Sequence, residues 1–179
     1  MENKKEKIAD CKTAISSTVR SLSNSQKIEV SFGNDSSKSK KNLIRLPELT
    51  PINNKLNYKQ IRAIADSKSL THRFSNPKTF KMYEPEGNIS KQLYRISEKI
   101  RCEKIGTSYF KGVKNNIETF YQERVSGLDL KSSEDKIVES FENYLRTKFL
   151  NFENKSQIDK KLKSYKKDLN EKFKDKINQ

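Results

Sequence analysis

The sequence predicts a mainly α-helical fold with one small β-hairpin at about residues 27–46 and a long C-terminal helix. Two observations support this fold class. Apolar residues recur every three or four positions through most of the 179-residue chain, which is the spacing of one helix face. Only one clear stretch, residues 27–32, alternates polar and apolar side chains with the period of a strand. We expect a helical domain over residues 1–150 and a Lys-rich amphipathic helical extension over residues 151–179.

The first helix is expected over residues 7–22. Its apolar stripe has a 3-4-4-3 spacing and consists of Ile8, Cys11, Ile15, Val19 and Leu22. Residues 27–32 then form a half-buried strand, and residues 33–41 form a loop rich in Ser and Lys. Residues 43–46 are expected to be the returning strand of the hairpin, which Pro47 ends.

A second helix is expected over residues 58–74 and ends before Pro77. Its predicted inward residues are Tyr58, Ile61, Ala65 and Leu70. Residues 78–83 form a short helical turn, and the Pro-Glu-Gly sequence at 85–87 is a break in helical structure.

The longest helical pattern runs from Ile89 to Val125 and contains two glycines, Gly106 and Gly112. A glycine inside an exposed helix costs about 1 kcal/mol relative to alanine. Each glycine therefore predicts close packing, a kink or a junction between two helices.

Two further helices complete the predicted fold. The first opens at residues 133–135, and its predicted inward stripe is Ile137, Val138, Phe141, Tyr144, Leu145 and Phe149. The second spans residues 156–177, and its stripe is Ile158, Leu162, Tyr165, Leu169, Phe173 and Ile177. The other faces of this last helix are rich in Lys, so its single thin apolar stripe needs a partner surface.

The formal net charge is +15, and Lys supplies 30 of the 38 basic residues. Such a charge is typical of a phosphate-binding surface, but it is equally typical of a solvated exterior. The Lys residues are spread along the whole chain, which favours the solvated exterior. The alternative function is a Lys-rich helical module that binds nucleic acid or another polyanion, with residues 155–179 as its basic segment. They hold nine Lys and four acidic residues.

The residue patterns of common active sites are missing from the sequence. His72 is the single histidine, and we find no nucleophile elbow, zinc-ligand spacing, Walker A loop or GxGxxG motif. The string DSSKS at 35–39 matches the DxSxS metal motif, but Lys38, Lys40 and Lys41 beside it disfavour a cation. We therefore predict no catalytic, cofactor-binding or metal-binding residue.

The chain has no apolar run long enough to span a membrane, and no secretory signal follows Met1. The two cysteines, Cys11 and Cys102, are far apart and lack the spacing of a disulfide framework. We expect a cytoplasmic protein with two reduced thiols.

Five segments, read in order, carry a recognisable pattern. They are TVR at 18–20 with IEVSFGND at 28–35; IRLPEL at 44–49; IRAIADS at 61–67 with Leu70 and Arg73; EKIRCEKIG at 98–106; and GV at 112–113 with Asn116. Together they resemble the N-terminal region of the CobT subunit of aerobic, ATP-dependent cobaltochelatase. The corresponding family patterns are TVRAIA, EVxFxND, ARLPE, RGxADSxALRL and EQARVEAIG followed by GVAxNL.

The resemblance implies a subunit of a chelatase complex that carries no active site of its own. CobT-type subunits work with an AAA+ ATPase subunit, CobS, and a large subunit, CobN, which binds the corrin ring. The complex uses ATP and Mg²⁺ to insert Co²⁺ into hydrogenobyrinic acid a,c-diamide during cobalamin synthesis. An acidic linker and a von Willebrand A-type domain follow in the family, and we expect the present chain to lack both.

The resemblance also selects residues as candidate interface positions or structural motifs. They are Arg20, Asp35, Asp66, Arg73, Glu98, Arg101, Glu103, Gly106 and Gly112. Glu98, Arg101 and Glu103 are the first candidates for docking contacts. The alternative is that they pair within their own helix, as Glu98 and Arg101 can at i,i+3. The family often has a CHD tripeptide where residues 74–76 read FSN, so no role of that histidine carries over.

Overall fold

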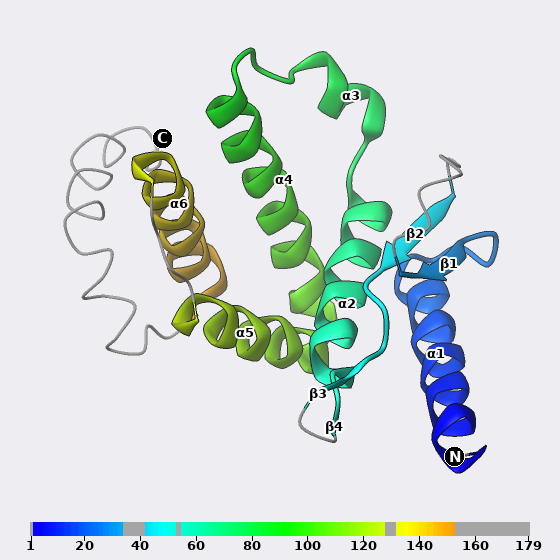
Figure 1. Cartoon of the computed structure of the whole chain (residues 1–179). Helices are drawn as coiled ribbons and strands as arrows, with labels where there is room; N and C mark the ends of the chain where they lie inside the picture. Colours follow the sequence, from blue (N-terminus) through cyan, green and yellow to red (C-terminus); the bar gives the residue numbers. More distant parts are fainter. Residues whose placement is uncertain (1, 34–41, 53–54, 128–131, 153–179) are drawn as a thin grey trace. The chain divides into compact units, whose positions relative to one another are not determined.

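A computed structural model describes residues 2–33, 42–52, 55–127 and 132–152, and these residues confirm the predicted mainly α-helical fold (Figure 1). They form six helices and four short strands. In chain order these are α1 (Glu2–Leu22), β1 (Glu29–Phe32), β2 (Leu43–Leu46), β3 (Pro51–Ile52), β4 (Lys55–Leu56), α2 (Tyr58–Phe74), α3 (Pro77–Met82), α4 (Asn88–Tyr109), α5 (Lys111–Ser126) and α6 (Ser133–Leu150).

The chain divides into two compact units. Unit 1 comprises Met1–Ser75 and Ile105–Phe120, and unit 2 comprises Asn76–Lys104 and Tyr121–Gln179. The predicted division into a domain over 1–150 and an extension over 151–179 stays a prediction. From residue 153 onward the predicted extension, including its long helix, lies outside the described residues.

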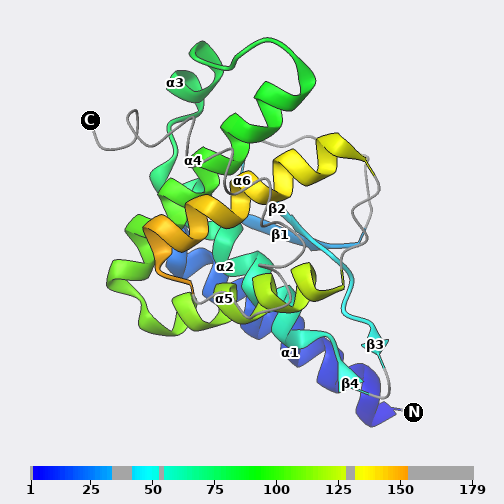
Figure 2. The ribbon, with the colours of Figure 1, turned by 90° about the vertical axis from the view of Figure 1, so that its left-hand side faces the viewer.

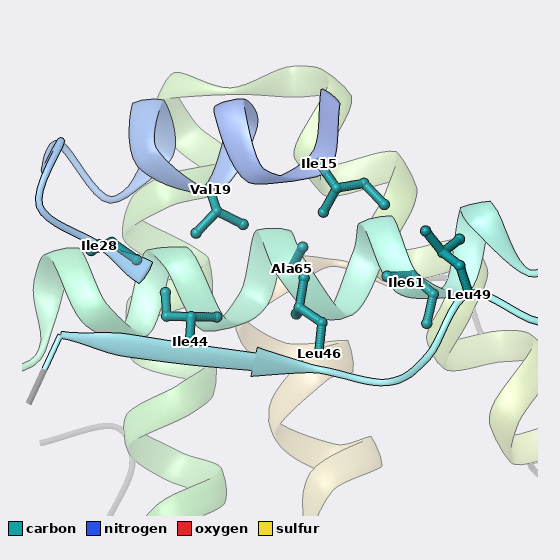
Figure 3. Close-up of a cluster of buried hydrophobic side chains, with 8 residues drawn as sticks. All are labelled: Ile15, Val19, Ile28, Ile44, Leu46, Leu49, Ile61 and Ala65. Atoms are coloured by element: carbon teal, nitrogen blue, oxygen red, sulfur yellow. The ribbon is translucent and has the colours of Figure 1, made fainter. Parts of the chain in front are cut away.

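The core of unit 1 forms where α1, α2 and β2 meet (Figure 3). Ile15 and Val19 point from α1 towards α2, which contributes Ile61 and Ala65. Ile28, Ile44, Leu46 and Leu49 complete the cluster from the strand region. Partly buried side chains pack around it, among them the predicted stripe residues Ile8, Cys11 and Tyr58. The stripes predicted for α1 and α2 are therefore confirmed.

The predicted β-hairpin is wrong in one respect: β1 and β2 pair in parallel, not antiparallel. Val30 pairs with Ile44 and Phe32 with Leu46, so alternate apolar residues of both strands share the face towards the core. A tight hairpin turn would force an antiparallel pair, whereas a parallel pair needs a return connection. The ten residues between the strands can span about 33 Å when extended, more than a four-residue strand of about 13 Å. A separate antiparallel pair, β3 with β4, precedes α2.

The long helical pattern from Ile89 to Val125 is interrupted at Phe110, where α4 ends and α5 begins in a new direction (Figure 1, Figure 2). The backbone carbonyl of Phe110 accepts hydrogen bonds from the amides of Val113 and Lys114, which starts α5. A junction between two helices was one of the alternatives predicted from Gly106 and Gly112. The observed junction lies between these two glycines.

In unit 2, α3 begins with Asn76 as its N-cap, and the Asn76 side chain accepts hydrogen bonds from the amides of Lys78 and Thr79. Phe80 of α3 stacks on Tyr94 of α4, with ring centroids 4.6 Å apart. Tyr94 also donates a hydrogen bond to the Phe80 carbonyl. The short helix is therefore attached to α4 through one aromatic pair.

Helix α6 begins as predicted, with Ser132 and Asp135 forming a capping box. Its predicted inward stripe is wrong at two of its six positions. Leu145 is buried, but Ile137 and Phe149 are exposed, and Val138, Phe141 and Tyr144 are half-buried. The helix also buries a polar face that carries Glu142, Asn143 and Arg146. Apolar periodicity did not indicate this polar face, because its charged side chains, Glu142 and Arg146, are buried as an ion pair.

Candidate functional site

Asp66 is a buried carboxylate of unit 1 and is fully inaccessible to solvent on α2. Arg62 donates from Nε to one carboxylate oxygen at 2.9 Å, and Asn116 of α5 donates from Nδ2 to the other at 2.8 Å. Burial raises the pKa of Asp66 above its ordinary value, and the hydrogen bonds from Asn116 and Arg62 oppose this rise only in part. Both oxygens bind neighbours within the unit, so the arrangement joins α2 to α5.

Arg20 and Arg73 both donate to backbone carbonyls near the end of α1. The Arg20 Nε donates to the Ile28 carbonyl at 3.2 Å, and the Arg73 Nη1 donates to the Leu22 carbonyl at the same distance. The Arg73 guanidinium also lies over the rings of Phe74 and Phe110, 5.3 and 5.8 Å from their centroids. These two candidate residues therefore fix the turn between α1 and β1.

Gly106 and Gly112 have different surroundings. A Cβ atom on Gly106 would lie 2.3 Å from Cδ2 and 2.8 Å from Cγ of Leu70, closer than any normal contact. Gly106 thus allows α4 to approach α2 closely. This confirms close packing, one of the alternatives predicted for this glycine. A Cβ atom on Gly112, the second residue of α5, would meet no atom within 4 Å.

Glu98 and Arg101 form a bidentate pair within α4, as their i,i+3 spacing predicts. The Arg101 Nε and Nη2 atoms donate to the two carboxylate oxygens of Glu98 at 2.7 and 2.9 Å. The side chain of Arg101 is 48 % exposed and is thus accessible to a partner. The interface role of this pair stays a prediction.

Cys102, the next residue of α4, is fully buried. Burial first, and then the charge of Glu98, raise the pKa of its thiol to about 12. The thiol is therefore protonated at neutral pH and does not act as a nucleophile in this structure. Cys11, in unit 1, is half-buried and also free.

Glu103 lies inside unit 2, where it accepts a 2.7 Å hydrogen bond from Nη1 of Arg146. Arg146 is only 2 % exposed and also donates from Nε and Nη2 to Glu142, one turn earlier on α6. Its guanidinium lies over the rings of Tyr121 and Phe152, 4.7 and 5.7 Å from their centroids. Glu103 is therefore a structural residue in this unit.

A larger group of charges surrounds this pair, and we call it the buried ion cluster. Its buried members are Glu103, Glu142 and Arg146, and around them lie Arg124, Glu139 and Lys99, of which Lys99 is 41 % exposed. Arg124 of α5 makes a bidentate pair with Glu139 at 2.7 and 3.0 Å and reaches Glu142 at 2.9 Å. The three positive and three negative charges balance, and they join α4, α5 and α6.

Electrostatics within the cluster favour the ionised form of Glu142. Burial alone would raise the pKa of Glu142, but Lys99, Arg146 and Arg124 outweigh burial and lower it to about 2. Sequence patterns did not single out any cluster member other than Glu103. Two features of the sequence could have indicated the pair of Glu142 and Arg146. Arg is scarce in this Lys-rich chain, and the two residues have i,i+4 spacing.

The described carboxylates do not assemble into a metal centre. Within residues 2–33, 42–52, 55–127 and 132–152, no three His, Cys, Asp or Glu side chains gather closely enough to hold a metal ion. His72 is exposed near the end of α2. Asp35, with its DxSxS string, lies outside the described residues. Among the helices that the structure describes, none combines the length and the apolar character needed to cross a membrane.

The match to a known protein family includes residues of both units. The sequence model of the family described as cobalamin biosynthesis protein CobT matches residues 5–145 of the chain. No solved structure matches the chain.

Proposed function

The chain belongs to the CobT family of cobalamin biosynthesis proteins, and we propose that it acts as the non-catalytic N-terminal part of a CobT-type cobaltochelatase subunit. In this role it docks onto an AAA+ ATPase subunit of the CobS type and onto a large subunit of the CobN type. The assembled complex uses ATP and Mg²⁺ to insert Co²⁺, its metal substrate, into hydrogenobyrinic acid a,c-diamide.

The observation that carries this proposal is the extent of the family match, which includes nearly all the described residues of both units. The internal contacts of the units agree with a docking role. Asp66 joins α2 to α5 in unit 1, and Arg146 joins α6 to α4 in unit 2. Within each unit, these side-chain contacts connect one helix to another. Connected helices suit a domain that transmits motion driven by ATP hydrolysis in another subunit.

We propose that the first docking contact lies at the C-terminal end of α3. Met82 and Tyr83 are 78 % and 66 % exposed there, and α3 itself buries no residue. Large exposed apolar and aromatic side chains are typical of protein interfaces, where Tyr and Met are enriched. Arg101 of α4 is a second exposed candidate, because Arg is also enriched at such surfaces.

The test is co-purification of the full chain with its AAA+ subunit in the presence of ATP and Mg²⁺. We expect a complex at micromolar concentrations, and the double variant Met82→Ser/Tyr83→Ser should weaken it at least tenfold. Tyr109→Ser is the matched control, because Tyr109 is 72 % exposed but belongs to unit 1. Absence of a complex with the unaltered chain would contradict the proposal.

A nucleic-acid titration of the same chain tests the competing polyanion function. We expect weak binding that disappears by about 0.2 M salt and shows no sequence preference, because counterion release alone drives it. Binding that persists above this salt concentration would favour the polyanion function instead.

A further inference from the structure

Two arginines at the end of α1, Arg20 and Arg73, are held in place without a carboxylate partner. In the part of the chain that the structure describes, each makes its hydrogen bond to a backbone carbonyl, that of Ile28 or of Leu22, and neither forms an ion pair. Five other arginines do pair with Asp or Glu side chains, and they are Arg62, Arg95, Arg101, Arg124 and Arg146. Arg20 and Arg73 therefore carry fixed positive charges that an anionic ligand can meet.

The two guanidinium groups keep most of their hydrogen-bond donors. Each of the three guanidinium nitrogens carries N–H donors, and each arginine uses one nitrogen on its carbonyl. Arg20 binds through Nε, which leaves Nη1 and Nη2, and Arg73 binds through Nη1, which leaves Nε and Nη2. Each arginine thus keeps two neighbouring nitrogens, the fork that holds two oxygens of one oxyanion. Arg73 is exposed and Arg20 is half-buried, so solvent reaches both side chains.

The carbonyls at the end of α1 do not need these remaining donors. The last four carbonyls of a helix have no partner inside the helix. Here the backbone amides of residues 23–25 donate to the carbonyls of residues 19–21, and Arg73 donates to that of Leu22. The helix dipole adds only about half a negative charge at this end, which the two guanidinium charges outweigh.

Ser23, the first residue after α1, adds a buried hydroxyl to this region. Its side chain is in a residue only 4 % exposed, and its Oγ has no hydrogen-bond partner among the described residues. The Ser23 amide donates to the Val19 carbonyl, so Ser23 continues the helical turn and lies beside Arg20 at i,i+3. Its peptide bond joins it to Leu22, whose carbonyl Arg73 binds. A buried hydroxyl without a partner costs stability, which a ligand that accepts its hydrogen bond would restore.

We propose that Arg20, Ser23 and Arg73 form a site that binds a phosphate group at the turn between α1 and β1. Two guanidinium forks and a hydroxyl match the several oxygens of a phosphate, whereas a carboxylate has two oxygens and is held by one fork. The ligand reaches Ser23 through a rotation of the neighbouring side chains, a change that is common on binding. The phosphate group belongs to free inorganic phosphate or to a nucleotide. All three residues belong to unit 1, so the site does not include the docking contact proposed at Met82 and Tyr83.

Titration of inorganic phosphate into the full chain at constant ionic strength tests the proposal. We expect saturable binding with a midpoint of about 1 mM by calorimetry. Arg73→Lys should weaken it at least tenfold, because Lys keeps the charge and a donor for the Leu22 carbonyl but lacks the fork. Arg95→Lys is the matched control, since Arg95 pairs with Glu84 at the surface of unit 2 and should not affect binding. Binding that does not saturate, or that Arg73→Lys leaves unchanged, would show that net charge alone attracts phosphate and would overturn the proposal.

Ser23→Ala separates binding from folding. Because the hydroxyl has no partner within the described residues, its removal should not lower the thermal unfolding midpoint in phosphate-free buffer. It should weaken phosphate binding at least threefold, so that about 10 mM phosphate raises the unfolding midpoint of the unaltered chain more than that of the variant. Ser21→Ala, at an exposed position in the last turn of α1, is the control and should respond to phosphate like the unaltered chain. A Ser23→Ala variant that binds phosphate as tightly as the unaltered chain would contradict the assigned site.

ADP without Mg²⁺ distinguishes the two sources of the phosphate group. If the ligand is a nucleotide, ADP should bind at least tenfold more tightly than inorganic phosphate; if it is free phosphate, ADP should bind no more tightly. In both cases Arg73→Lys should weaken the binding of ADP and of phosphate together, which supports the site. ADP binding that is unaffected by Arg73→Lys would place the nucleotide elsewhere and count against a phosphate site at this turn.

Discussion

Unit 1 packs Ile61 of α2 against Ile15, Val19, Ile44 and Leu46, and its buried carboxylate, Asp66, binds two neighbours. Unit 2 joins α4, α5 and α6 through Arg146, Arg124 and the carboxylates around them. The interior of unit 1 is thus stabilised mainly by apolar contact, and that of unit 2 depends in addition on the pairing of buried charges.

This difference determines what each unit tolerates. A close-packed apolar interior responds to volume, because an added methyl group has no space. A buried ion cluster responds to charge balance, because removing one ion leaves its partners desolvated and uncompensated. Substitutions that change only volume or only charge should therefore distinguish the units.

The largest effect is expected for Arg146→Met. It removes the guanidinium that Glu103 and Glu142 share, which leaves two buried carboxylates without that partner, and should lower the free energy of unfolding by about 3–5 kcal/mol. Urea denaturation measures it. Arg95→Met is the matched control, because Arg95 pairs with Glu84 at the surface of the same unit and should contribute about 1 kcal/mol or less. Equal losses for the two variants would show that the buried ion cluster does not stabilise unit 2.

Acidification should remove the contribution of Glu142. Its pKa is held at about 2 in the folded chain, below an unfolded value of about 4.3, so its ionisation stabilises the fold fully above pH 4.3. This stability is lost as the pH falls towards 2. The free energy of unfolding of wild type minus that of Glu142→Gln should therefore decrease by on the order of 2–3 kcal/mol from pH 5 to pH 2. A difference that does not vary with pH would contradict the account of the cluster.

Added volume should affect unit 1 at Gly106. In Gly106→Ala the new Cβ atom overlaps Leu70, so we expect a loss of about 1–3 kcal/mol in thermal or urea unfolding. Gly112→Ala is the control in the same unit, because its Cβ atom meets no neighbour. That control should be neutral or stabilise α5 by up to about 1 kcal/mol. If the two variants behave alike, the approach of α4 to α2 does not require glycine.

Asp66 should show the opposite pH dependence to Glu142. Because burial raises its pKa in the folded chain, its contribution is largest below the unfolded value of about 3.9 and is lost as the pH rises through the folded value. The free energy of unfolding of wild type minus that of Asp66→Asn should thus decrease from pH 3 to pH 7. A difference that grows with pH would mean that Arg62 and Asn116 outweigh burial.

The smallest effect is expected for Arg101→Ala. An exposed i,i+3 pair contributes about 0.2–0.5 kcal/mol, so unfolding of the isolated chain should hardly change. A larger change in affinity for the proposed AAA+ partner would identify Arg101 as a docking residue. An affinity that falls no more than stability would restrict it to a role within α4.

The same comparison explains which features the sequence could predict. Apolar side chains mark a buried face directly. The sequence could therefore predict the stripe from Ile8 to Leu22 and the inward residues Ile61, Ala65 and Leu70. The start of α6 was predicted from residues 133–135, because the signals that begin a helix are local, but its N-cap, Ser132, was not named.

Features that depend on partners far apart in the sequence could not be predicted. The alternation in β1 and β2 gave the inward face, but the same pattern fits parallel and antiparallel pairing. The stripe of α6 pointed to Ile137 and Phe149, because nothing local shows that Glu142 and Arg146 find counter-ions on α4 and α5.

The positions of the arginines, however, do indicate which residues have defined partners. All eight arginines lie in the described residues, and each one makes a hydrogen bond, ion pair or other contact. In a chain with 30 Lys, the choice of Arg at a position indicates a fixed, geometrically defined partner.

The distribution of cysteine gives each unit its own chemical reporter. Cys11 is half-buried in unit 1, and Cys102 is fully buried in unit 2 with a thiol that stays protonated. A thiol reagent can modify Cys102 only when unit 2 opens, so its labelling rate measures that opening in the unaltered chain. Followed by mass spectrometry at increasing urea, the order in which the two thiols react would show whether the units unfold together or one after the other.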